Sequence, residues 1–298
     1  MTTTKPKLVA KTNLTFHSNW LEHTVAEYFV LAPYDPATVY DTCDCYYTNG
    51  LDETATEWLA QGRKVVVDCL WETAKDCGTA HALSHPNWFW YQESLWYRHL
   101  GYHEYQPNKT LTHAALMPIR LHKPFRQQLV SMLGTYLDNC IWSYQAQGRN
   151  LPNDREWDSQ RYFNPEWYDS TCYSICAESF MHPTGLDYPF VTEKTFKPIA
   201  FRHPFLIAGN QFTLAFLRKN GFETFENLFD ESYDVLPSAH DRLIAVRNNA
   251  VNYKKIAPYD TITKQKLEHN YQRFFDSEHV RNCFRKQILE PLLHYAET

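Results

Sequence analysis

A regular alternation of short apolar runs and helix-like segments between residues 171 and 225 constrains the fold more than any other feature of the chain. From residue 173 to residue 209 the sequence is YSICAESFMHPTGLDYPFVTEKTFKPIAFRHPFLIAG. The pattern predicts strands and helices in turn, at 171–177, 193–201, 204–208, 211–220 and 222–225. Because helices link successive strands through short connections, these strands should form a parallel sheet.

The rest of the chain follows the same alternation. Upstream, the pattern predicts strands at 7–11, 64–70, 114–119 and 140–144 and helices at 52–61 and 124–137, with further apolar segments at 46–48 and 87–100. A boundary near residues 110–115 separates an N-terminal part, 1–112, from a C-terminal part, 113–298. The second part ends in helices predicted at 238–251, 262–275 and 277–295. We therefore predict an α/β fold of two Rossmann-like lobes with a helical C-terminal tail.

Composition excludes some classes of function. The net charge of −5 argues against tight, non-specific binding to nucleic acid, which needs clustered cations. The N-terminus lacks the apolar core of a signal peptide, and no apolar run is long enough to span a bilayer, so we expect a cytoplasmic protein without a transmembrane segment. The 8 cysteines are expected to be reduced thiols, and their spacing does not match a zinc site. We expect no bound metal and no cofactor.

Thr192, Glu193 and Lys194 open the helix predicted at 193–201. With Thr192 as N-cap, the other two residues fall in the first helical turn, where free N–H groups and a partial positive charge attract phosphate. Lys194 is unfavourable against the helix dipole, a position that makes sense if an anion lies in front of it. Glu193 can accept hydrogen bonds from sugar hydroxyls. Capping patterns also begin many helices that bind nothing, so the triplet alone leaves a purely structural role open.

The surrounding residues add a resemblance. Around the triplet the chain carries, in order, Tyr173-Ser174-Ile175-Cys176-Ala177-Glu178-Ser179, His182-Pro183, Asp187-Tyr188 and Pro204. This succession resembles the α1,3/α1,4-fucosyltransferases, family 10 of the glycosyltransferases, although the family has Asn where this chain has Ser179. The resemblance implies a GT-B fold and GDP-fucose as the donor substrate. It places Glu193 on the ribose or sugar and Lys194 on the diphosphate, with Glu178 and Tyr188 lining the same pocket.

A second match lies upstream, where the family has a strand, an Arg, a helix and a further strand. By this resemblance Arg126 is the second cation that binds the diphosphate. An Arg can hold two phosphate oxygens at once and keeps its charge. The family's Ser-Asn before this Arg is replaced here by Ile119-Arg120, so Arg120 is an alternative for the role.

The general base of an inverting transferase takes the proton of the acceptor hydroxyl, and a carboxylate at the carboxyl end of a strand is well placed for this. Glu72 follows the strand predicted at 64–70 and is our first choice, since the family places a Glu after a similar strand. Asp68 and Glu93 are the alternatives. An exposed loop glutamate without a catalytic role explains Glu72 equally well.

The sequence thus predicts an inverting glycosyltransferase that moves a sugar, with fucose as the first choice, from a nucleotide-sugar to a hydroxyl acceptor such as a glycan. The N-terminal lobe would bind the acceptor and the C-terminal lobe the donor. Two alternatives stay open, namely a viral-type DNA-base glycosyltransferase and a non-catalytic GT-B-like protein that binds carbohydrate or a partner.

Overall fold

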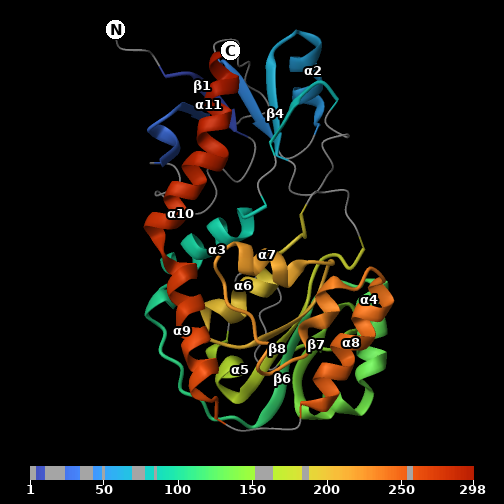
Figure 1. The fold of residues 1–298 in the computed structure, drawn as a ribbon. Coiled ribbons are helices and arrows are strands. Elements are labelled where there is room, and N and C mark those ends of the chain that lie inside the picture. Colours follow the sequence, from blue (N-terminus) through green and yellow to red (C-terminus); the bar gives the residue numbers. More distant parts are fainter. Residues whose placement is uncertain are drawn as a thin grey trace. The chain divides into compact units, whose positions relative to one another are not determined.

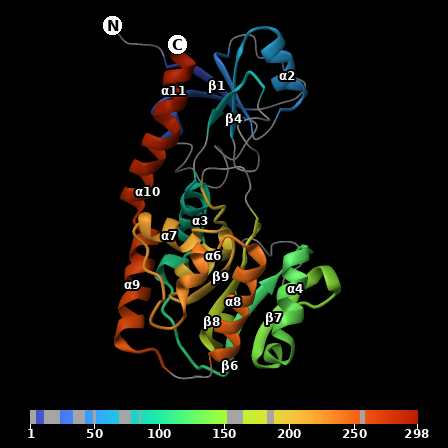
Figure 2. The same cartoon turned by 45° about the vertical axis from the view of Figure 1, so that its right-hand side comes forward.

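The structure, a computed structural model, describes residues 5–10, 24–33, 43–48, 51–68, 78–83, 86–151, 164–182, 188–253 and 258–298. The chain forms two compact units (Figures 1 and 2). The first contains Met1–His99 and Asp276–Thr298, and the second contains Leu100–Phe275. Within the ranges just given, each has helices around one sheet whose strands all pair in parallel, so the prediction of two Rossmann-like α/β lobes is confirmed.

The first unit holds a five-stranded sheet in the order β2-β1-β3-β4-β5. Its strands are β1 (Lys7–Ala10), β2 (Val30–Pro33), β3 (Cys45–Thr48), β4 (Lys64–Asp68) and β5 (His81–Leu83). Helix α2 (Glu53–Ala60) is capped by Asp52, whose carboxylate accepts the Ala55 N–H at 2.7 Å. Trp58 of α2 packs on Tyr46 of β3, with ring centroids 5.5 Å apart, and both are buried in the core of this unit.

The end of the chain packs with the first unit, whereas the sequence placed it in the second lobe. Helix α10 (Ser277–Phe284) continues through a π-helical turn, Arg285–Leu289, into α11 (Glu290–Glu297). Helix α10 packs on α3 (Trp88–His99), where Phe284 meets Trp88 at 6.3 Å between ring centroids. The unit boundary at His99 and Leu100 also precedes the boundary expected at residues 112 and 113. A glycine with φ of 82°, Gly101, ends the helix at this point.

The second unit holds a four-stranded sheet in the order β7-β6-β8-β9. Its strands are β6 (His113–Ile119), β7 (Cys140–Tyr144), β8 (Thr171–Ala177) and β9 (Phe205–Ala208). All residues of β8 and β9 are buried, as in strands covered on both faces. The alternation of strands and helices predicted for this stretch is therefore confirmed up to residue 220.

The helices of the second unit cover both faces of its sheet. They are α4 (Pro124–Leu133), α5 (Pro165–Ser170), α6 (Glu193–Ala200), α7 (Thr213–Lys219), α8 (Ala239–Asn252) and α9 (Thr261–Phe275). Helix α6 lies against β8 and β9 and packs on α9, while α4 and α8 pack on each other (Figure 1). Within the described residues, none of the helices combines the length and the apolar character needed to cross a bilayer.

Two predicted elements differ from the structure. Helix α4 ends at Leu133 and continues as a 3₁₀ segment, because Gly134 at φ 50° breaks the helical run. The strand predicted at 222–225 is wrong. Side chains, rather than a neighbouring strand, satisfy that backbone: Asn270 accepts the Glu223 N–H at 2.7 Å and donates to its carbonyl at 2.8 Å, and Glu231 accepts the Phe225 N–H.

Candidate functional site

Between β6 and β8 the order of the strands in the second sheet changes direction, although all the strands run parallel. From β6 the chain passes through α4 to β7 on one side, and from β8 it passes through α6 to β9 on the other. Right-handed connections in opposite directions put α4 and α6 on opposite faces, so the loops after β6 and β8 diverge at the carboxyl edge. Such a switch point is where open parallel sheets bind ligands.

Glu178 follows β8 at this edge and is fully buried. One carboxylate oxygen accepts the Thr192 N–H at 3.0 Å and the Thr195 hydroxyl at 2.7 Å. The other accepts the Thr192 hydroxyl at 2.6 Å and the Ser179 N–H at 3.2 Å. With four donors on its two oxygens, Glu178 fixes the first turn of α6 to the end of β8. Its position therefore makes it a positioning residue rather than one that faces a ligand.

Helix α6 begins where the sequence predicted, with Thr192 as N-cap accepting the Lys194 N–H. The Lys194 ammonium lies 2.6 Å from Oε1 of Glu193 and 3.3 Å from the Thr192 hydroxyl. Burial raises the pKa of Glu193, but the ammonium groups of Lys194 and Lys197 outweigh it and leave that pKa below its ordinary value. Glu193 is therefore ionised at neutral pH, and Lys194, with a side chain 24% exposed, is open to solvent on one side.

Arg126, in the first turn of α4, reaches across to the end of β8. Its guanidinium donates to the carbonyl oxygens of Ala177 at 3.0 Å, Glu178 at 2.7 Å and Leu121 at 3.1 Å. The residue is only 2% exposed, and in the described part of the chain its Nε has no hydrogen-bond partner. Burial lowers the pKa of Arg126, while the carboxylates of Glu178 and Glu193 oppose that shift.

Lys123, the N-cap of α4, is a member of this site that the sequence reasoning missed. Its ammonium donates to the Ser179 carbonyl at 2.6 Å and lies 4.3 Å from the centre of the Phe180 ring. Burial lowers the pKa of Lys123, and the nearby charges of Arg126 and Lys194 lower it further. The available signal was its place directly before Pro124, since proline marks the first turn of a helix.

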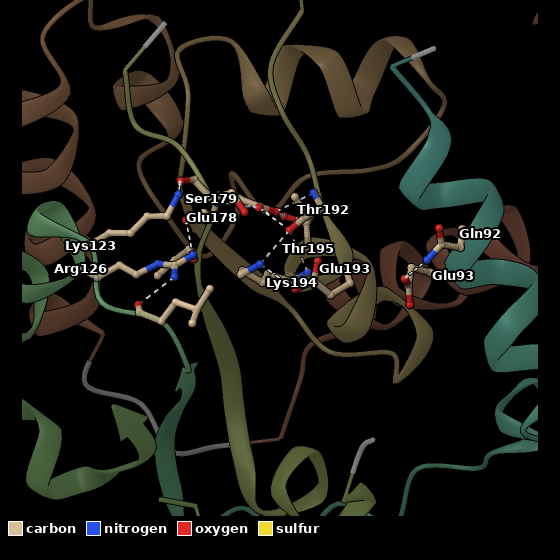
Figure 3. A network of polar contacts seen from close by, with 12 residues as sticks. Gln92, Glu93, Lys123, Arg126, Glu178, Ser179, Thr192, Glu193, Lys194 and Thr195 are labelled. Carbon is tan, nitrogen blue, oxygen red and sulfur yellow. Dashed lines mark hydrogen bonds and ion pairs between the residues drawn. The ribbon is translucent and has the colours of Figure 1, made fainter. Parts of the chain in front are cut away.

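Three cations therefore gather around the Glu178–Ser179 end of β8 (Figure 3). Lys194 is paired with Glu193, whereas neither Lys123 nor Arg126 forms an ion pair with any carboxylate in the ranges described. Partly buried positive charge without a counter-ion is costly for folding and marks candidate functional sites. The arrangement suits a ligand with more than one negative charge.

The other predicted site residues lie as follows. Tyr188 is half-buried on the segment that leads to α6, near Phe190, whose N–H is accepted by Asn210 at 3.1 Å. Arg120 is exposed directly after β6. Glu72 lies outside the described residues. Asp68 is the last residue of β4, and Glu93 is buried in α3, where it accepts a hydrogen bond from Gln92 at 3.3 Å.

The acidic segment at 230–234 has structural roles. Asp230 caps the 3₁₀ helix Glu231–Val235 by accepting the Ser232 N–H at 2.9 Å. Asp234 accepts the N–H groups of Leu214 at 2.8 Å and Ala215 at 2.9 Å and so caps α7. Among the described residues, no three His, Cys, Asp or Glu side chains are grouped so that they could hold a metal ion.

Comparisons with known proteins give matches at the level of structure alone. No family model matches the sequence, and no curated protein matches it. A crystal structure of an α1,3-fucosyltransferase aligns with 94% of this chain and 93% of its own, at a TM-score of 0.48 and 11% identity. Structures of α1,3-fucosyltransferase with GDP-fucose and with GDP each align at a TM-score of 0.44 and 9% identity, over 93% and 94% of both chains respectively.

All three are structures of α1,3-fucosyltransferases, the family that the sequence motifs resemble.

Proposed function

We propose that this protein is an inverting glycosyltransferase that moves a sugar from a nucleoside-diphosphate sugar to a hydroxyl acceptor. The observation that supports it is the positive charge of Lys123, Arg126 and Lys194 at the switch point of the second sheet. Within the part of the chain that the structure describes, Lys123 and Arg126 have no carboxylate partner. A diphosphate supplies the missing negative charge, and it is also the leaving group of such a transfer. GDP-fucose is the first donor to test.

The three cations have different parts in this proposal. Lys123 and Lys194 are partly exposed and contact the diphosphate oxygens directly. Arg126 is held by three carbonyl groups, so it orients the end of β8 and contributes positive charge to the site without contacting the diphosphate directly. Fixed positive groups stabilise the charge that builds on the leaving diphosphate without having to reorganise during the reaction. Glu193 holds Lys194 in place and accepts hydrogen bonds from ribose or sugar hydroxyls.

The chemical step is a single displacement at the anomeric carbon. The acceptor oxygen forms the new bond to that carbon as the bond to the diphosphate oxygen breaks, which inverts the configuration. A carboxylate takes the proton of the acceptor hydroxyl. Glu72 stays our first choice for this base, with Asp68 and Glu93 as alternatives.

Calorimetry with GDP, UDP and ADP tests the donor site. We expect Lys194→Ala to weaken binding of the preferred nucleotide about tenfold or more, because a charge-assisted hydrogen bond contributes roughly 1.5–3 kcal/mol. Lys264→Ala is the control with the same change of charge. Lys264 is exposed in the first turn of α9, which begins near the opposite edge of the sheet, where Tyr259 bonds to Cys172 at the start of β8.

Absence of binding by all three nucleotides, or equal affinity in both variants, would overturn the proposed donor site. Hydrolysis of nucleotide-sugars measures the chemistry separately, and Glu72→Gln should keep donor binding while losing transfer. A mobility shift with duplex DNA at physiological salt distinguishes the DNA-base alternative.

A further inference from the structure

Phe212 has an unusual backbone conformation at the carboxyl edge of the second sheet. Its φ of 65° and ψ of 18° lie in the left-handed region, which favours glycine or asparagine and is strained for an aromatic residue. Among the described residues the other non-glycine residue with positive φ is Arg202, whose guanidinium lies 3.4 Å from the centre of the Tyr271 ring. Phe212 is 48% exposed, and its ring contacts no other ring or cation of the described residues.

The backbone around Phe212 is held firmly. The Phe212 N–H donates to the Asp234 carbonyl at 2.8 Å, and the Phe212 carbonyl accepts the Phe216 N–H at 2.9 Å. Next to it, the side-chain amide of Gln211 donates a hydrogen bond to the backbone carbonyl of Val235 at 2.6 Å. The ring is thus carried by a fixed turn, as a rigid recognition surface requires.

Burial does not explain the choice of side chain. A ring that is nearly half exposed gains little from the hydrophobic effect, while the left-handed backbone costs energy. Val235, whose backbone is bonded to the neighbouring Gln211, is also exposed, at 59%. Two apolar side chains therefore lie exposed at one place on this edge, and a residue that folding disfavours there points to a role in binding.

The turn lies beside the cation cluster along the same edge. Strands β8 and β9 are neighbours, and the Glu178 N–H donates to the Ala208 carbonyl at 2.9 Å. A Cβ added to Gly209 would lie 3.5 Å from the Cβ of Glu178, so the backbones following the two strands approach closely. Phe212 follows Gly209 by three residues, a chain distance of at most about 11 Å. A nucleotide whose diphosphate contacts the cations can therefore extend its base as far as Phe212.

We propose that Phe212 is the stacking platform for the nucleobase of the donor, with Val235 against the edge of the base. This inference rests on the proposed function and adds the part of the site that recognises the base. A base stacks on an aromatic ring through its π-face, and loss of such a ring typically weakens binding about fivefold to 150-fold.

Calorimetry with GDP and with inorganic pyrophosphate tests the proposal. We expect Phe212→Ala to weaken GDP about tenfold and to leave pyrophosphate unchanged, and Phe212→Trp to restore GDP binding. Phe212→Asn should weaken GDP equally but raise the Tm, because asparagine accepts the left-handed backbone. Ile262→Ala, which removes a 54% exposed side chain on α9, should change the affinity for neither GDP nor pyrophosphate.

Each result separates the inference from the proposed function. Unchanged GDP affinity in Phe212→Ala, or an equal loss for GDP and pyrophosphate, would overturn the platform while leaving the cation site standing. The same holds if the unaltered protein binds pyrophosphate as tightly as GDP, since the base then contributes nothing. If it binds neither ligand, both proposals fail.

Discussion

Glu178→Gln should be strongly destabilising although it changes a single atom. The carboxylate is fully buried and accepts four hydrogen bonds, from Ser179, Thr195 and twice from Thr192. Glutamine has the same shape, but its amide group replaces one accepting oxygen with a donor. In either amide orientation, two of the four donors then face another donor.

The magnitude follows from those two donors. A buried donor without an acceptor costs about 1–3 kcal/mol, and a hydroxyl can turn to accept from the new amide, so one donor of each pair is partly relieved. We therefore expect the free energy of unfolding to fall by about 2–4 kcal/mol. Glu268→Gln is the matched control, because that side chain is 48% exposed and pairs with Arg202 at the surface, where an ion pair contributes at most about 1 kcal/mol.

Urea unfolding of both variants measures the difference, and hydrogen exchange at the amides of Thr192 and Lys194 reports on the first turn of α6. For Glu178→Gln the free energy of unfolding should fall and exchange at these amides should speed up, whereas the control should lose at most about 1 kcal/mol and leave these amides unchanged. A decrease no larger than that of Glu268→Gln would refute the idea that Glu178 anchors the helix that carries Glu193 and Lys194.

Two further predictions concern lysines with lowered pKa. The pKa of Lys123 is lowered in the free protein, by burial first and then by Arg126 and Lys194. A bound diphosphate raises the pKa of Lys123 again, so the affinity for GDP should be full below the pKa of the free protein and fall as the pH rises through it. Calorimetry across this pH range should show a weaker dependence of GDP affinity on pH for Lys123→Met. The same pH dependence in both proteins would contradict this. Burial lowers the pKa of Lys109 to about 8 from 10.5, so folding penalises the charged side chain at pH 7 and this penalty disappears as the pH rises. Lys109→Met never carries the penalty. Its free energy of unfolding, relative to that of the unaltered protein, should therefore decrease by about 3 kcal/mol between pH 7 and pH 10.5. Urea unfolding across that range measures it, and a constant difference would show that the Lys109 ammonium is not penalised.

Local rules of the chain account for the elements that the sequence predicted well. Thr192 was identified as an N-cap because a hydroxyl before a helix-like run satisfies a free N–H group, and its side chain does accept the Lys194 N–H. Strand β8 was identified by its mostly apolar run, in which Ser174 is the one polar residue after Thr171. The strand predicted at 222–225 is wrong because the burial of Phe222 and Phe225 comes from packing against the rings of Phe196 and Phe205, while Asn270 and Glu231 hold the backbone in place of a neighbouring strand.

The parts of the candidate site depended on local information to different degrees. Glu193 and Lys194 are neighbours in the sequence, so their ion pair at 2.6 Å follows from their positions in one helical turn. Lys123 was overlooked because its contacts, Ser179 and Phe180, lie more than fifty residues further along the chain. Arg126 was chosen by resemblance, which gave no sign that three carbonyl groups would hold its guanidinium.

By itself, the sequence determined the parallel α/β character of the chain and the start of α6, since hydrophobic periodicity and capping act over a few residues. Only the tertiary structure decided that Glu178 is an anchor, that Lys123 joins the cations and that Phe212 adopts a strained, exposed conformation. Each of those outcomes depends on which strand ends become neighbours. The order of strands in a sheet is set by packing between distant segments, and no local pattern encodes it.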